Sequence, residues 1–139
     1  MTPADIARKR ILVTNDDGIN APGLEAMIDI ATQLSQDVWV VAPEYNQSGA
    51  GHSLSLTHPV RARQISETKY ALEGTPTDCL LFAVKHLLKD PQPDIVLSDE
   101  HIVRTGVRHV QFGELENVRT AMRADNDGLR LHGISLLAL

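Results

Sequence analysis

The spacing of apolar residues changes from one segment of the chain to the next, as it does where strands and helices alternate. Residues 11–13 and 38–42 are short, near-continuous apolar runs rich in β-branched side chains, which is typical of parallel strands covered on both faces. Between them, apolar residues recur at every third or fourth position from Pro22 to Leu34, as on one face of a helix. Residues 11–42 therefore predict a β-α-β unit with parallel strands.

A polar, glycine-containing stretch at residues 44–58 follows this unit. Beyond it, residues 60–65 and 69–72 predict two short strands, whose order in the sheet is left open.

A second helix is predicted to begin after Thr75, because this residue type caps helices and is followed by Pro76 in the first turn. Asp78, at the third helical position, suits the positive end of the helix dipole. Apolar residues then recur with helical spacing, and residues 94–98 predict another buried parallel strand. The pattern as a whole indicates a three-layer α/β fold over residues 1–139.

Composition narrows the class of protein. Of 139 residues, 42% are hydrophobic and 22% charged, values near the average for a soluble globular domain. A net charge of -5 argues against a nucleic acid duplex or a membrane as partner, because those anionic surfaces attract clustered Lys and Arg. The single cysteine, Cys79, excludes an intrachain disulfide and fits a reducing compartment. With no signal-peptide pattern at the start of the chain, we expect a cytoplasmic protein.

Polar residues follow three of the predicted strands. Asn15, Asp16 and Asp17 follow the first, residues 44–48 the second and residues 98–101 the third. Ligands of parallel α/β sheets bind at these carboxyl ends of the strands. Two adjacent carboxylates also call for a counter-charge, which Mg²⁺ or Mn²⁺ would supply through oxygen ligands. The same residues are ordinary turn formers, so the motif alone leaves metal binding and a plain turn open.

The loop at residues 47–53, with the sequence QSGAGHS, is a second candidate site. Its small residues would let backbone N–H groups approach a phosphate, its hydroxyls could donate to one, and His52 could do the same. A loop of this kind is more often only a flexible connection. The chain has no nicotinamide or flavin fingerprint, so we expect no redox cofactor.

Four segments closely resemble, in order and spacing, the successive motifs of the SurE family (survival protein E, 5'/3'-nucleotidases). They read ILVTNDDGINAPGLEAM, VWVVAPEYNQSGAGHSLSL, LEGTPTDCLLFAV and PDIVLSD, and together they cover residues 11–99. The resemblance implies a single SurE-like, Rossmann-like α/β domain with three layers and a mainly parallel sheet. It also implies that the fold is truncated, because residues 100–139 diverge from the family's later motifs.

The resemblance further implies a divalent metal, Mg²⁺ or Mn²⁺, held by Asp16, Asp17 and Ser48. A family asparagine completes that ligand set, and an ungapped alignment places His101 at its position. Histidine binds Mn²⁺ but suits Mg²⁺ poorly. Asp16 and Asp17 are also the catalytic candidates, although which of them acts as a base is left open. Four residues are candidates for substrate binding: Asn15, Gly49, Ala50 and His52.

The implied reaction is metal-dependent hydrolysis of nucleoside monophosphates, or of other small phosphomonoesters, to an alcohol and phosphate. This is a 5'-nucleotidase activity. We expect it to be reduced or lost, because the family's asparagine is replaced and the family's YSGTV motif, which helps form the phosphate site, has no counterpart in this chain. Two alternatives stay open. One is a catalytically inactive remnant that binds metal or nucleotide, and the other is a receiver-type signalling domain with Asp99 as phospho-acceptor. The preferred base, the phosphate position and a homodimer are also left open.

The divergent tail carries its own expectations. Within residues 103–139 we expect a cover helix and a final strand at 134–137. Residues 125–128 resemble the start of a calcium loop but lack its distal glutamate, so they predict a turn. We also expect the tail to reflect a truncation or a frame shift, which the gene's other two reading frames would test.

Overall fold

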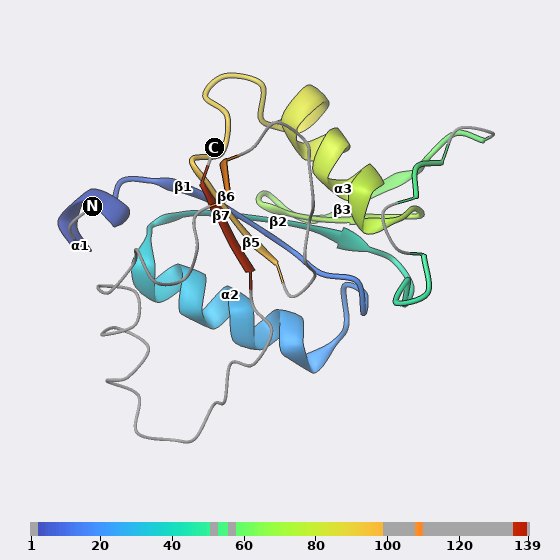
Figure 1. Cartoon of the computed structure of the whole chain (residues 1–139), viewed down its shortest axis with the longest axis horizontal. Coiled ribbons are helices and arrows are strands. Elements are labelled where there is room, and N and C mark those ends of the chain that lie inside the picture. The colour runs from blue at the N-terminus through green and yellow to red at the C-terminus, as the bar shows by residue number, and fades with distance from the viewer. Residues whose placement is uncertain (1–2, 51–52, 56–57, 99–107, 110–134, 139) are drawn as a thin grey trace.

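The computed structural model describes residues 3–50, 53–55, 58–98, 108–109 and 135–138 (Figure 1). Its helices are α1 (Pro3–Ile6), α2 (Pro22–Leu34) and α3 (Pro76–Phe82), the last continuing into a π-helical turn at Ala83–Leu87. Its strands are β1 (Arg10–Thr14), β2 (Asp37–Pro43), β3 (Ala62–Ser66), β4 (Lys69–Leu72), β5 (Ile95–Ser98), β6 (Arg108–His109) and β7 (Ser135–Ala138). In this part of the chain no helix is long and apolar enough to cross a membrane.

The strands form one seven-stranded sheet in the order β3-β4-β2-β1-β5-β7-β6. The central strand β1 is parallel to both neighbours, β2 and β5, and β4 is parallel to β2. Only the pairs β3·β4, β5·β7 and β6·β7 are antiparallel. The mainly parallel α/β fold is therefore confirmed, as are the parallel strands expected at 11–14, 38–42 and 94–98.

Helices cover both faces of the sheet, α2 on one side and α3 on the other (Figure 1). In β1, Ile11 and Val13 pack in the cluster that contains α2, whereas Leu12 packs in the cluster that contains α3. Each of these side chains is at most 1% exposed, so each contributes about 1.5–3 kcal/mol to the free energy of unfolding. Burial on both faces is the reason why the three central residues of the strand, Ile11 to Val13, are all apolar.

The two predicted strands whose order was open form a hairpin at the edge of the sheet. β3 pairs antiparallel with β4, and β4 joins β2 in parallel register, with Val40 opposite Lys69. The final strand expected at 134–137 is observed as β7, one residue later. The cover helix and the turn expected at 125–128 lie outside the described residues.

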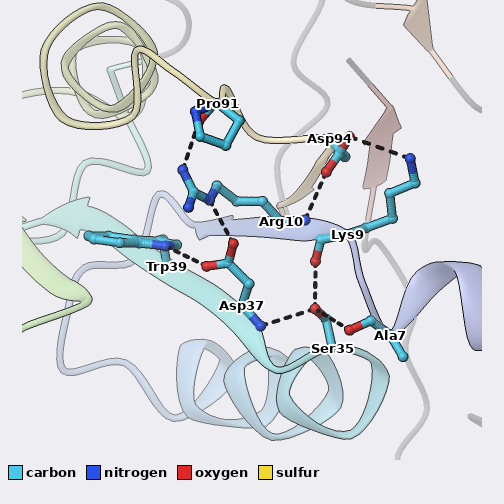
Figure 2. Close-up of polar contacts among 8 residues, drawn as sticks. All are labelled: Ala7, Lys9, Arg10, Ser35, Asp37, Trp39, Pro91 and Asp94. Atoms are coloured by element: carbon cyan, nitrogen blue, oxygen red, sulfur yellow. Dashed lines mark hydrogen bonds and ion pairs between the residues drawn. The ribbon is translucent and has the colours of Figure 1, made fainter.

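A polar network joins the amino ends of the central strands (Figure 2). Arg10 Nε donates to Asp37 Oδ2 at 2.8 Å, and Arg10 Nη1 donates to the Pro91 carbonyl oxygen at 2.7 Å. The guanidinium also lies 5.7 Å from the ring centroid of Trp39, whose Nε1 donates to Asp37 Oδ1 at 2.8 Å. The Arg10 backbone N–H donates to Asp94 Oδ2 at 2.9 Å. This network fixes the amino ends of β1, β2 and β5. The candidate site lies at the other end of the strands, where their carboxyl ends are.

Candidate functional site

The loop after β1 is closed by a buried asparagine. Asn15 is fully buried, its Nδ2 donates to the Gly18 carbonyl oxygen at 2.9 Å, and its Oδ1 accepts from the Gly18 N–H at 3.2 Å. Gly18 has a φ of 109°, in the left-handed region that favours glycine. Asn15 therefore holds a tight turn with Asp16, which is partly buried, and the exposed Asp17 between its ends. Its direct contact with a phosphate stays a prediction.

The loop after β2 lies against this turn through backbone contacts. The N–H of Gln47 donates to the Asp16 carbonyl oxygen at 2.7 Å, and the N–H of Ile19 donates to that of Pro43 at 2.7 Å. A Cβ on Gly18 would come within 3.3 Å of the Tyr45 carbonyl carbon. These contacts hold the second loop against the turn as far as Gln47, the residue before Ser48.

Ser48 contacts the acidic pair directly. Its Oγ lies 3.0 Å from Asp17 Oδ1, and it also lies 2.7 Å from Asn46 Oδ1. Asn46 Oδ1 in addition accepts from the Ser48 N–H at 2.8 Å. Within the described residues the Asp16 carboxylate forms no hydrogen bond or ion pair. The structure thus brings Asp17 and Ser48 together, with Asp16 adjacent in the chain.

The other candidates of this loop differ in their surroundings. The Ala50 N–H donates to the Gln47 carbonyl oxygen at 2.8 Å, which closes a turn. No acceptor for the Gly49 N–H occurs in the described part of the chain, and Gly49 is exposed with nothing within 4 Å of an added Cβ. Gly49 is therefore the better placed backbone donor of the two. His52, Asp99 and His101 lie outside the described residues.

The carboxyl ends of β1 and β5 lie side by side. Thr14 is opposite Ser98 in parallel register, and both side chains are buried. Thr14 Oγ1 has no hydrogen-bond partner among the described residues. Buried hydroxyls are normally satisfied, so this edge retains hydrogen-bonding capacity next to the acidic pair.

The donor set suits a hard divalent cation. Asp16, Asp17 and Ser48 supply two carboxylates and a hydroxyl, the oxygen ligands that Mg²⁺ and Mn²⁺ prefer. The described residues contain no group of three or more His, Cys, Asp or Glu side chains that could hold a metal. These three side chains would thus fill only part of a coordination shell, as is common for Mg²⁺, which keeps several waters.

An ion pair that sequence reasoning missed lies beside this loop. Arg63 of β3 holds Glu44 with two bonds, Nη2 to Oε1 at 2.6 Å and Nε to Oε2 at 3.1 Å. The hydrogen bond to Glu44 and the negative charge of Glu44 both raise the pKa of Arg63. No local pattern in the sequence pairs these residues, because the contact depends on the placement of the β3-β4 hairpin.

Comparisons with known proteins agree on one family. A family model described as "Survival protein SurE" matches residues 11–99. The 5'-nucleotidase SurE of Methylorubrum populi is 65% identical over 89 residues, which are 64% of this chain and 35% of that protein. The 5'-nucleotidase SurE of Parvibaculum lavamentivorans is 64% identical over 89 residues, which are 32% of its length.

A solved structure supports the same assignment. The crystal structure of the SurE protein from Aquifex aeolicus superposes with a TM-score of 0.60 and 41% sequence identity, covering 64% of this chain and 36% of that one. The chain thus spans about a third of the length of the relatives it matches.

Proposed function

This chain belongs to the SurE family, and we propose that its site binds a divalent metal and hydrolyses nucleoside monophosphates to nucleoside and phosphate. The two curated relatives described above are named 5'-nucleotidase SurE, which supports the substrate class. The observation that carries the proposal is the contact between Ser48 Oγ and Asp17 Oδ1, 3.0 Å long. It joins two of the three expected ligands from loops that follow different strands.

The roles of the residues follow from their positions. Asp16, Asp17 and Ser48 would hold Mg²⁺ or Mn²⁺, and such an ion polarises phosphoryl oxygens and lowers the pKa of bound water. The Gly49 N–H would donate to a phosphoryl oxygen, where a fixed dipole stabilises the charge that develops during hydrolysis. Asn15 would act by keeping the two carboxylates in place. His52 remains proposed as a hydrogen-bond donor to the phosphate, and His101 as a further metal ligand.

A phosphate-release assay tests the proposal. The purified chain is incubated with several nucleoside monophosphates and Mn²⁺, with and without EDTA. We expect slow release that EDTA abolishes and that the Ser48→Ala variant reduces by at least tenfold. A matched variant, Ser66→Ala on the exposed edge strand β3, should leave the rate unchanged. Release that persists in EDTA would overturn the metal-dependent reaction.

A second candidate function is binding of metal or nucleotide without turnover. The family match ends at residue 99, and the position of the expected fourth ligand reads His101. Mn²⁺ binding with no release of phosphate from any nucleotide would favour this function over the enzyme. The receiver-type alternative is not carried further, because the matched region includes the SGA and GTPTDC segments, which a receiver does not use.

A further inference from the structure

We propose that Asp78 is a positioning residue for the Ser48 loop, which it anchors through Ser55. The Ser48 loop is residues 46–55, described at 46–50 and 53–55. One of its ends contacts the acidic pair, and the other end is bound at the start of α3. The identity of the ligand that Ser48 holds rests on the proposed function, but the anchor itself does not.

The anchor consists of one buried carboxylate with three donors. Asp78 is 7% exposed, and its Oδ1 accepts from the Ser55 N–H at 2.9 Å. Its Oδ2 accepts from the Ser55 hydroxyl at 2.7 Å and from the Thr75 N–H at 2.8 Å. Burial raises the pKa of Asp78, but the hydrogen bonds from Ser55 and Thr75 lower it by more, so its pKa lies below the ordinary value. The carboxylate is therefore ionised at neutral pH, the form that accepts all three bonds.

Thr75 adds a second tie between the helix and the loop. Its side-chain oxygen accepts from the Asp78 N–H at 3.2 Å, completing a capping box, and donates to the Ser53 carbonyl oxygen at 2.5 Å. The helix start thus binds the loop at both Ser53 and Ser55. Capping α3 requires only the bonds between Thr75 and Asp78, so the bonds to the loop are additional.

The neighbouring glycine indicates how closely this anchor is packed. A Cβ on Gly74 would lie 2.7 Å from Asp78 Oδ2, 3.0 Å from Asp78 Cβ and 3.2 Å from Val60 Cγ1. Real Cβ atoms essentially never make contacts under 3.0 Å, so a larger residue at position 74 would displace the Asp78 carboxylate. The GTPTD segment therefore combines a small residue, a cap and a loop anchor.

Two backbone hydrogen bonds connect the anchored end of the loop to the Ser48 end. The Ser53 N–H donates to the Ala50 carbonyl oxygen at 3.3 Å, and the Ala50 N–H donates to that of Gln47 at 2.8 Å. Ser48 itself is exposed, and exposed hydrogen bonds such as its own contribute little to order. The bond from the Gln47 N–H to the Asp16 carbonyl oxygen holds the chain before Ser48, and the Ser55 end holds it after Ser48, so release of the Ser55 end should let Ser48 move away from Asp17.

The variant Ser55→Ala separates this role from helix capping. It removes the Ser55 hydroxyl bond but leaves the Thr75–Asp78 capping box intact. Ser53→Ala is the matched control, because Ser53 contributes backbone atoms only to the contacts of the described residues. Asp78→Asn weakens both the anchor and the cap and is the stronger variant.

Hydrogen–deuterium exchange of the full chain is the first measurement, made without metal. In Ser55→Ala, the hydrogen-bonded amides of Gln47, Ser48 and Ala50 should exchange roughly 3- to 10-fold faster, as the loss of one hydrogen bond predicts. Amides of α3 should be unchanged, and Ser53→Ala should match the wild type. Faster exchange confined to α3, no change anywhere, or an equal effect of Ser53→Ala would overturn the anchor.

Mn²⁺ titration is the second measurement. Ser55→Ala should raise the dissociation constant for Mn²⁺ by about the same factor as it speeds exchange in the loop. Ser53→Ala should leave that constant unchanged. If Ser55→Ala speeds loop exchange but binds Mn²⁺ as the wild type does, the positioning role is overturned. If the wild type itself binds no Mn²⁺, the proposed function fails, and the exchange result alone still decides whether Asp78 anchors the loop.

Discussion

The Ser48 hydroxyl oxygen lies 3.0 Å from Asp17 Oδ1, although 31 positions separate the two residues in the chain. The backbone bond from Gln47 to Asp16, 2.7 Å long, runs beside it and joins the same two loops. A plain turn at Asp16–Asp17 would require neither contact. The acidic pair is thus part of a structure built from the carboxyl ends of two neighbouring parallel strands.

Gly18→Ala should destabilise the chain by about 1–2 kcal/mol, because alanine is strained at a φ of 109°. The added Cβ would also press against the Tyr45 backbone at 3.3 Å. Gly23→Ala is the control, since its Cβ would meet nothing within 4 Å in the first turn of α2. Urea unfolding should show a loss for Gly18→Ala and no loss for Gly23→Ala. Equal stability of the two variants would contradict the strained turn.

Arg10→Ala should cost about 2–3 kcal/mol of unfolding free energy, because it leaves the partly buried Asp37 without its cation and removes the contact with Trp39. Arg8→Ala, at an exposed position nearby, should change the free energy by less than about 0.5 kcal/mol. Both variants should bind Mn²⁺ as the wild type does, since this network is at the amino edge of the sheet. A weakened Mn²⁺ affinity in Arg10→Ala alone would contradict that separation.

Several features of the fold could be predicted from local patterns. The strands around residues 11–13 and 38–42 have apolar side chains on both faces, and the cap formed by Thr75 and Asp78 depends on residues three positions apart. The order of β3 and β4 could not be predicted, because all residues of β3 are exposed and no burial pattern fixes its neighbour. Its predicted limits, 60–65, begin two residues before the observed strand begins and end one residue before it ends.

The candidate site was predictable in part. The resemblance named Asp16, Asp17 and Ser48 as metal ligands, which stays a prediction, and the structure brings Asp17 and Ser48 into contact. The Ser55–Asp78 bonds could not be predicted, because they join a loop to a helix start across 23 positions. The local sequence shows which hydrogen bonds a residue is able to form, and the fold determines which partner it forms them with.

Acid should remove the stabilisation that Asp78 provides. Its pKa in the folded chain is lowered, so the ionised form is favoured by folding. The contribution is fully present above the ordinary Asp pKa of about 3.9 and is lost as the pH falls through the lowered folded value. Asp78→Asn should therefore be less stable than the wild type at pH 7, with a difference that shrinks below about pH 4.

Urea unfolding at a series of pH values measures this difference. Asp29→Asn, on the exposed surface of α2, is the control and should differ little from the wild type at any pH. A stability difference for Asp78→Asn that grew on acidification would have the wrong sign for a carboxylate with a lowered pKa.

Metal binding at the acidic pair is tested most directly by the Mn²⁺-dependent shift in unfolding temperature of the wild type and of the Asp16→Asn/Asp17→Asn double variant. At about 100 times the dissociation constant, a metal bound only by the folded chain adds roughly 2.7 kcal/mol, a rise of several degrees for a chain of this size. We expect this rise for the wild type and for Asp29→Asn, and none for the double variant. An equal rise in the wild type and the double variant would contradict the account, because Mn²⁺ would then bind elsewhere.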